Sequence, residues 1–502
     1  MRRMLGLLLV LLGAGAVGGW FAWPYLLGSR KPILVGILHS TTGPMAVNEA
    51  SMIDAEKLAI EEINAAGGLL GRTVVPVIVD GKSDPDVYAR EAEHLIRDEN
   101  VSVIFGCYTS AARKSVQAVV QRNDHLLVYA VAYEGLEQSP NIIYTGAAPN
   151  QQVIPTVNWC RDILKAKSFY LLGNDFVWAH AVNEIVKDQL KALGATVAGE
   201  DYVPMGSTQL DGAVTRAVAA KPDVILSTLI GDSNLPFYEK IRKNNPAAAA
   251  IPIASFVVAE DELRGLPARD MVNDYSVCNY FEAIDRDENR KFVAAFKQFC
   301  KDKDRVTSDV IATAYSSVRL WAQAVRDVET DETRLVRQAM LKQSLDAPEG
   351  VISIDRETQH TWRPFFIGKV QGDGRIEIVW TLVKPIRPVP FPFSRNRGQW
   401  EKFLENLHSA WGGKWQAPAV STGPRAALDW PGTEAITRFQ DRERLSEANR
   451  KGRAEGQRAK NQKDREPRAE NRRGPMSGGW EADQFLRCRL VFCPWLSALC
   501  VS

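Results

Sequence analysis

The sequence lacks the residue arrangements that mark a disulfide framework, a zinc site or a common hydrolase. Seven cysteines are scattered through 502 residues without a CxxC pair, which argues against a disulfide framework. None of the six histidines lies two to five residues from another, so a local zinc pair is not supported. HExxH, GxSxG and GxxxxGK[ST] are also absent. We therefore expect no metal, no cofactor and no catalytic residue.

One nucleotide-type motif does occur, and its position argues against a function. The stretch "GAGAVG" (residues 13–18) matches GxGxxG. It lies inside an apolar run without the strand–turn–helix unit that a dinucleotide site requires. We interpret the match as chance in a run of small residues.

Net charge is also small. The chain has 62 basic and 60 acidic residues, a formal charge of +2, which gives no reason to expect nucleic acid as a partner. Charge is dense only in residues 438–473, where large apolar residues are few. Such a segment has too little apolar surface to fold. With the proline-rich stretch "PIRPVPFPF" before it, this composition predicts a largely disordered C-terminal extension over residues 393–502.

The N-terminal segment, residues 1–30, is the longest apolar run. Two arginines precede a stretch without charge from residue 4 to residue 29. This is the form of a secretory signal peptide, but its length approaches the roughly 20 residues that span a bilayer. Near its end, Trp20, Trp23 and Tyr25 resemble an interfacial aromatic belt and favour a membrane anchor. Both interpretations place the body of the protein outside the cytoplasm.

From residue 32 onward, short apolar runs alternate with amphipathic stretches. "PILVGILHS" (32–40) predicts a buried strand and "MIDAEKLAIEEINAAGG" (52–68) a helix. The alternation continues to "IPIASFVV" (251–258). Nearly continuous apolar strands indicate parallel sheets with helices on both faces. The run is too long for one compact sheet and is interrupted near Gly146, so we predict an α/β protein with two similar lobes.

The polar residues of this region gather where the predicted strands end. Ligands of parallel α/β sheets bind beyond the carboxyl ends of the strands. Hydroxyls, an amide and aromatic rings occur there, without Lys or Arg, which favours a small neutral polar ligand over a phosphate. Ordinary helix capping by Ser and Thr is the alternative for any single residue. The six strand ends read "HSTTG", "GCYTS", "YAVAYEG", "GNDFVW", "STLIGDSN" and "SFVVAE".

One strand end carries a cysteine, Cys107. A thiol at a helix N-terminus can have a lowered pKa, and His39 ends the first strand at the same sheet edge. A Cys–His pair is therefore conceivable. Free cysteines are more often buried and inert, and this is the interpretation we favour. We do not expect an enzyme.

Several motifs carry a resemblance to a known family. "ILVGILHSTTGPMA" (33–46), "VIFGCYTSAARKSV" (103–116), "YEGLEQSPNIIYTGAAPNQQ" (133–152) and "STLIGDSNLPFYEKI" (227–241) closely resemble type I periplasmic binding proteins of the urea and short-chain amide branch. The resemblance covers roughly residues 32–392. It implies a two-lobed clamp with three crossovers and a ligand cleft between the lobes. On this basis lobe I comprises residues 32–146 and 277–345, and lobe II residues 147–276 and 346–392.

The resemblance also implies a set of ligand-binding residues. Where Phe176 and Trp178 stand, related sequences often have Tyr, and Ala130 replaces a proline. The implied ligand is urea or a short amide, delivered to an ABC transporter permease. A membrane sensor of the same fold, or a binder of branched-chain amino acids, is the alternative. The implied site residues are Tyr108, Ser110, Tyr129 and Val131 from lobe I, and Phe176, Trp178, Thr228, Asp232 and Phe256 from lobe II.

Overall fold

The computed structural model describes residues 31–243, 245 and 248–418. The predicted signal peptide or anchor, and the extension beyond residue 418, lie outside the described residues. The chain divides into two compact units, residues 1–437 and 438–502, and all that follows concerns the first. Within its described residues, every helix is too short or too polar to cross a membrane.

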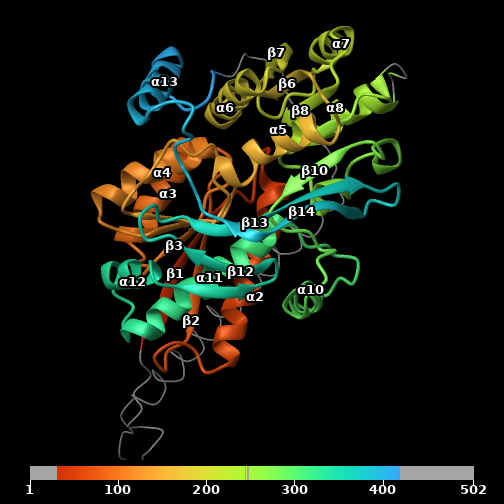
Figure 1. The fold of residues 1–502 in the computed structure, drawn as a ribbon. Coiled ribbons are helices and arrows are strands. Elements are labelled where there is room, and N and C mark those ends of the chain that lie inside the picture. The colour runs from red at the N-terminus through yellow and green to blue at the C-terminus, as the bar shows by residue number, and fades with distance from the viewer. Residues whose placement is uncertain (1–30, 244, 246–247, 419–502) are drawn as a thin grey trace, which may run out of the picture. The chain divides into compact units, whose positions relative to one another are not determined.

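The first lobe is built on a parallel sheet with strand order β2-β1-β3-β4-β5 (Figure 1). β5 is a short strand that the sequence pattern did not predict. Helix α2 packs against β1 and β2, and α3 packs against α4. The strands are β1 (Ile33–His39), β2 (Val74–Asp80), β3 (Ile104–Gly106), β4 (Leu127–Tyr129) and β5 (Ile142–Tyr144). The helices of this stretch are α2 (Ala46–Ala65), α3 (Pro85–Arg97) and α4 (Ser110–Arg122).

Local sequence explains where two helices of this lobe start. Asp84 caps α3 by accepting from the N–H groups of Asp86 and Val87, and Thr109 caps α4 by accepting from Ala112 N–H. Gly106 ends β3, shortly before the cap of α4, and its φ is +147°. A Cβ at this position would lie 2.1 Å from the Leu38 carbonyl oxygen. Only glycine fits so close an approach of β3 to β1.

The second lobe has a nine-stranded sheet of order β11-β12-β13-β10-β9-β8-β6-β7, with β14 paired to β13. Strands β6 to β10 pair in parallel. By contrast, β10 and β14 each pair antiparallel with β13. The parallel βα pattern matches the sequence prediction. The strands are β6 (Ser168–Asn174), β7 (Thr196–Val203), β8 (Val224–Thr228), β9 (Ile253–Ser255), β10 (Tyr275–Cys278), β11 (Ser344–Ala347), β12 (Gly350–Ile354), β13 (Thr361–Val370) and β14 (Ile376–Ile386).

The remaining helices divide between the lobes (Figure 1). In lobe II, α5 packs against α6, and η3 is a short π-helical continuation of α8. In lobe I, α10 and α11 pack against α2, and α12 packs against α11. The lobe II helices are α5 (Val153–Asp162), α6 (Val177–Leu193), α7 (Asp211–Ala219), α8 (Asn234–Tyr238), η3 (Glu239–Lys243) and α9 (Glu260–Leu263). The lobe I helices are α10 (Asp287–Cys300), α11 (Asp309–Val328) and α12 (Thr333–Met340).

The segment after the proline-rich stretch differs from the sequence prediction. A helix, α13 (Arg397–Ala410), follows where we expected an extension largely without structure. Asn396 caps α13, and Trp400 is buried, with its indole N–H donating to the Pro392 carbonyl oxygen. The helix lies against α6, and Arg395 pairs with Asp188 of that helix. Apolar residues spaced along α13 drive this packing, and the proline run before them masked the signal.

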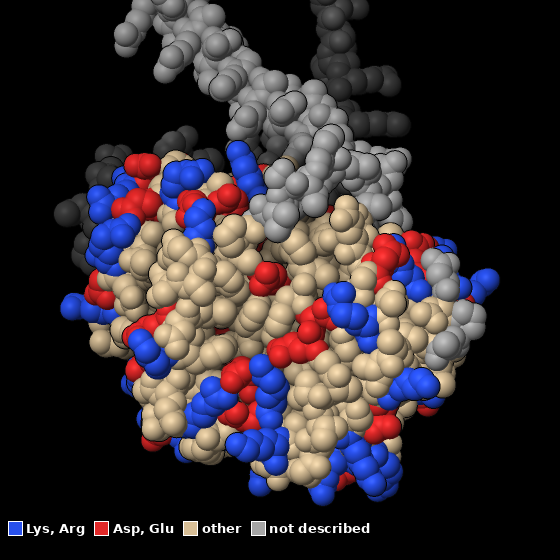
Figure 2. Space-filling model, turned by 90° about the horizontal axis from the view of Figure 1, so that it is seen from above, with Lys and Arg blue, Asp and Glu red and all other residues tan. Residues whose placement is uncertain are grey.

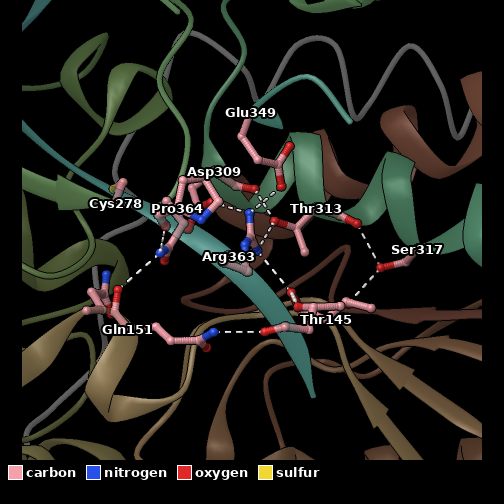
Figure 3. Close-up of polar contacts among 12 residues, drawn as sticks. Thr145, Gln151, Cys278, Asp309, Thr313, Ser317, Glu349, Arg363 and Pro364 are labelled. Carbon is pink, nitrogen blue, oxygen red and sulfur yellow. Dashed lines mark hydrogen bonds and ion pairs between the residues drawn. The ribbon is translucent and has the colours of Figure 1, made fainter. Parts of the chain in front are cut away.

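Arg363 of β13 joins lobe II to lobe I through a buried set of contacts (Figure 3). The Thr145 carbonyl oxygen, which directly follows β5 of lobe I, accepts from Arg363 Nη1 at 3.0 Å. Asp309, at the start of α11 of lobe I, has its carboxylate 3.0 Å from Nη2, and Glu349, in the β11–β12 turn of lobe II, lies 2.8 Å from the same nitrogen. The Arg363 side chain is 1% exposed. One buried guanidinium therefore ties the two lobes together close to the first crossing.

Candidate functional site

A cavity of about 560 Å³, part of it open to solvent, lies between the two lobes. Its walls come from the carboxyl ends of strands in both sheets, as parallel α/β topology dictates. Seven of the nine predicted site residues line it: Tyr108, Ser110, Tyr129, Val131, Phe176, Trp178 and Phe256. The rings of Phe176 and Trp178 lie 5.9 Å apart and form an aromatic wall on the lobe II side.

Two predicted residues lie outside this cavity. Thr228 is buried in the sheet, and its hydroxyl donates to the Leu172 carbonyl oxygen at 3.3 Å. Asp232 lines a second, smaller cavity together with Asn48 and Glu262. Both residues sit close to a strand end in sequence, but side chains alternate in direction along a strand and its following turn, so not all of them face the cleft.

The Ser110 hydroxyl is already engaged. It donates to Glu134 and accepts from Arg113 Nη1 at 2.9 Å. Arg113 is fully buried, pairs with Glu134 and Glu137, and lies 4.9 Å from the centre of the Tyr129 ring. This network holds one side of the cavity rigid. Ser110 therefore offers a ligand its backbone N–H rather than its hydroxyl.

Two helices begin at the cavity wall. The N–H groups at the start of a helix have no partner within it, and they attract electronegative ligand atoms. Ser110 begins α4, and Ser308 precedes α11. Ser308 lines the cavity and is 1% exposed, yet its hydroxyl has no hydrogen-bond partner. A buried hydroxyl without a partner is costly, and this one lies at the cavity wall, so Ser308 is a candidate site residue that the sequence analysis missed.

Two carboxyl groups also line the cavity, Glu262 and Asp309. Burial raises the pKa of Glu262 to about 7, and the neighbouring charge of Asp261 adds to this rise. Asn48 of lobe I donates to Glu262 of lobe II at 2.6 Å. Burial also raises the pKa of Asp309, against the lowering effect of Arg363. At neutral pH the Glu262 carboxyl can thus donate or accept a hydrogen bond at the cleft.

The lobes touch each other at the cleft. Besides the Asn48–Glu262 bond, the Ser51 hydroxyl donates to Asp261 at 2.6 Å. Ser51 and Asn48 lie on α2 of the first lobe, and the two acids lie on α9 of the second. The structure therefore has the clamp in a closed arrangement.

The geometry does not support the Cys107 hypothesis. Cys107 lies outside the cavity walls, and burial raises the pKa of its thiol well above the ordinary value. His39, its proposed partner, instead contacts two carboxylates, with Nδ1 at 2.9 Å from Glu49 and Nε2 at 3.1 Å from Glu56. A protonated thiol beside an imidazolium already paired on both nitrogens is not an activated nucleophile.

Neither the charges on the face drawn in Figure 2 nor the possible metal ligands among the described residues mark a second site. On the face drawn in Figure 2, basic and acidic side chains are interspersed over the surface of the described residues. Across the described residues, no group of three or more His, Cys, Asp and Glu side chains is placed to hold a metal ion. The interlobe cavity is therefore the candidate functional site.

Two α/β lobes joined by three crossings around a cleft define a ligand-binding clamp of the periplasmic binding protein type. Residues 33–397 match the model of the periplasmic binding protein domain family, and the chain belongs to that family.

Curated relatives show the same likeness at low identity. Leu/Ile/Val-binding protein homolog 7 of Brucella abortus (strain 2308) is 22% identical over 383 residues, which cover 72% of this chain and 94% of the relative. Leu/Ile/Val-binding protein BraC3 of Rhizobium johnstonii is 25% identical over 203 residues, 39% of this chain and 54% of the relative. Limonene hydroxylase of Geobacillus stearothermophilus is 30% identical over 116 residues, 23% of this chain and 21% of that protein. The chain thus spans about half the length of BraC3 and about a fifth of the length of limonene hydroxylase.

Solved structures share the fold. A solute-binding protein of an ABC transporter from R. palustris, in complex with benzoate, has a TM-score of 0.63 at 17% identity and covers 71% of this chain and 98% of its own. The branched-chain amino acid substrate-binding protein LivJ from Streptococcus pneumoniae, in complex with isoleucine, has a TM-score of 0.60 at 19% identity, with 71% and 100% covered. At these identities the likeness concerns the two-lobed fold alone.

Proposed function

We propose that the protein is an extracytoplasmic solute-binding protein of the ABC transporter type, and that it captures urea or a short-chain amide in its interlobe cleft. Membership of the periplasmic binding protein domain family supports the class and the compartment. The proposed role is reversible capture without turnover, followed by delivery to a membrane permease. The alternative proposed role is that of a ligand sensor of the same fold.

The observation that carries the ligand proposal is the polar lining of the cavity. Lys and Arg are absent from its walls, whereas the free Ser308 hydroxyl, helix N–H groups and the Glu262 carboxyl are present. A planar amide needs a donor for its carbonyl oxygen and an acceptor for its NH₂ group. Helix N–H groups and Ser308 supply the first, and Glu262 supplies the second. Aromatic rings on both sides suit a flat ligand.

A second ligand class has its own supporting observation. The starts of α4 and α11 both face the cavity, and paired helix N-termini also suit a carboxylate. Relatives are named Leu/Ile/Val-binding proteins, and the structural neighbours hold benzoate and isoleucine. Branched-chain amino acids and small aromatic acids are therefore the competing ligands.

Calorimetry with a ligand panel separates these two classes. We expect urea, formamide or acetamide to bind, and leucine, isoleucine and benzoate to bind more weakly by at least tenfold. Binding of the carboxylates alone would transfer the proposal to the second class. Failure of every compound to bind would overturn the ligand proposal altogether.

Ser308 offers a sharper test of the cavity. Replacing Ser308 with alanine should weaken binding of the ligand found in the panel by roughly 3- to 10-fold, the value of one net hydrogen bond. Ser316 of α11 is a matched control, because its hydroxyl is also buried without a partner but lies outside the cavity walls. Ser316→Ala should leave the dissociation constant unchanged. Equal losses in both variants would contradict a direct role of Ser308.

Glu262 predicts a pH dependence of stability. Its folded-state pKa of about 7 exceeds the ordinary value of 4.5, so the folded state binds the proton more tightly than the unfolded state. This contribution is fully present below pH 4.5 and is lost as the pH rises through 7. Thermal melts from pH 4 to pH 8 should therefore show the Glu262→Gln variant gaining stability relative to the wild type as the pH rises. Glu405→Gln, at an exposed carboxyl of α13, controls for the loss of a negative charge and should show no such trend.

A further inference from the structure

Residues 411–417, which we call the strap, return from the end of α13 to the cleft. The strap lies beyond residue 397, where the match to the family model ends. It pairs with the start of α6 on lobe II: Val177 N–H donates to the Trp415 carbonyl oxygen, and Ala417 N–H donates to the Asp175 carbonyl oxygen, both at 3.0 Å. A β-bridge joins Gln416 to Phe176 between these bonds. Phe176 is part of the cavity wall, so the strap is attached to the site itself.

The strap also contacts lobe I. The Lys114 ammonium of α4 lies 4.7 Å from the centre of the Trp415 ring. Lys114 is only 8% exposed, and a cation over an aromatic face gains more when water is excluded. Lys414 adds a longer contact, 4.0 Å from the Asp86 carboxylate of α3. Trp415 thus contacts lobe II through its backbone and lobe I through its ring.

This double contact distinguishes Trp415 from its neighbour Trp411. The Trp411 ring makes an edge contact with His180 of α6, with ring centres 5.1 Å apart. That contact holds the strap on lobe II alone. Covering the apolar surface of lobe II would require only Trp411 and the packing of α13. The contact between the Trp415 ring and an ammonium group of lobe I goes beyond that role.

The strap also changes the chemistry of the cleft. The N–H of Val177 opens α6, a 17-residue helix, and an unpaired N–H there would attract an anion. The Trp415 carbonyl oxygen occupies it. The first N–H group of α6 is therefore withdrawn from the ligand.

We propose that the strap is a latch that holds the two lobes closed over the ligand, with Trp415 as the positioning residue. When the lobes part, Lys114 moves away from the Trp415 ring while the backbone bonds keep the strap on lobe II. Closure is then favoured by the strap in addition to the ligand. The ligand part of this inference rests on the proposed function, whereas the closure part does not.

The test measures lobe closure in the full-length protein without ligand. Spin labels at Ala118→Cys of α4 and Ala192→Cys of α6, both exposed positions, report the distance between the lobes by double electron–electron resonance. The half-buried Cys300 and the three cysteines beyond the described residues, Cys488, Cys493 and Cys500, are replaced by serine in every sample to prevent their labelling. We expect the wild type to show a closed population, and the Trp415→Ala and Lys114→Met variants to shift toward longer distances.

Two further variants give the measurement its specificity. Trp411→Ala removes a ring of the same kind that contacts lobe II and should leave the distance distribution close to that of the wild type. Trp415→Phe keeps an aromatic face for Lys114 and should restore much of the closed population. Thermal melts identify any variant that fails to fold. Should Trp415→Ala do so, Trp415→Leu replaces it, because Lys114→Met also removes the 2.9 Å ion pair of Lys114 with Glu137.

Ligand release gives the second measurement. For the ligand identified in the panel, Trp415→Ala should release it roughly tenfold faster, the size expected of one well-shielded cation–π contact. Wild-type distances and release rates in both Trp415→Ala and Lys114→Met would overturn the latch. So would an equal opening in Trp411→Ala, because it would show general loosening of the strap. If no compound of the panel binds, the ligand proposal fails, while the distance measurement still decides the latch.

Discussion

Replacing Arg363 with methionine is expected to lower the free energy of unfolding by about 3–5 kcal/mol, the cost of removing one partner from a buried ion pair. Asp309 and Glu349 both lie against this guanidinium, and Glu349 is 1% exposed. Methionine fills a similar volume but leaves two buried carboxyls without their cation. Denaturant unfolding followed by fluorescence measures the change.

A matched exposed arginine provides the control for Arg363. Arg387 also contacts two carboxylates, those of Asp355 and Glu357, but its side chain is 49% exposed. Arg387→Met should therefore cost about 0–1 kcal/mol.

The loss of unfolding free energy in Arg363→Met should also shrink as the pH falls from 8 to 4. Burial already raises the pKa of both carboxyls, and acid neutralises the charges that the variant leaves unpaired. A loss equal to that of Arg387→Met would mean that Arg363 does not tie the two lobes together.

Replacing His39 with glutamine should have a comparable effect, about 3–5 kcal/mol at neutral pH. Burial lowers the pKa of His39, but the charge of Glu56 and the hydrogen bonds to Glu49 and Glu56 outweigh it and raise the pKa to about 10. His39 is therefore a cation at neutral pH, placed between two carboxylates that are 1% exposed. Its loss leaves like charges facing each other in the core.

The pH dependence of stability also tests whether His39 is a cation in the folded protein. The folded-state pKa of His39, about 10, lies above the ordinary value of 6.5. Its contribution to stability is present below pH 6.5 and is lost as the pH rises through 10. The gap between wild type and His39→Gln should therefore narrow from pH 7 to pH 10. His94 is the control: it pairs with Asp98 on the surface with 42% of its side chain exposed, and His94→Gln should cost at most about 1 kcal/mol. A constant gap would show that His39 is neutral in the folded protein.

The two-lobed α/β fold could be predicted from the sequence because its strands are short apolar runs with clear polar ends. The strand β5 and the helix α13 could not be predicted, for different reasons. β5 is an isolated apolar run of three residues, Ile142–Tyr144, whereas the equally short β3 and β4 lie within longer apolar stretches. The apolar side of α13 becomes visible only when α6 supplies a surface for Trp400 to pack on.

The candidate site was predictable where strand ends carry large side chains, and not elsewhere. Tyr108, Phe176 and Trp178 were expected at the cleft and line the cavity. Thr228 was also expected there, but the direction of its side chain depends on a strand register that no sequence pattern fixes. Ser308 and Glu262 come from helix starts far along the chain, and only the folding of the two lobes brings them to one wall. Ser308 had a usable signal, since a Ser-Asp pair before an amphipathic helix predicts a cap.

The four described cysteines bear on where such a protein can fold. Cys107, Cys160 and Cys278 are buried free thiols, and Cys300 is half-buried. Burial raises the pKa of Cys160 and of Cys300 to about 12, and it raises the pKa of Cys107 and Cys278 well above the ordinary value. Because only the thiolate exchanges with disulfides, the three buried thiols resist oxidative crosslinking once the core has formed. This part of the chain is thus suited to an oxidising compartment without relying on a disulfide, provided that folding buries the thiols before they can exchange.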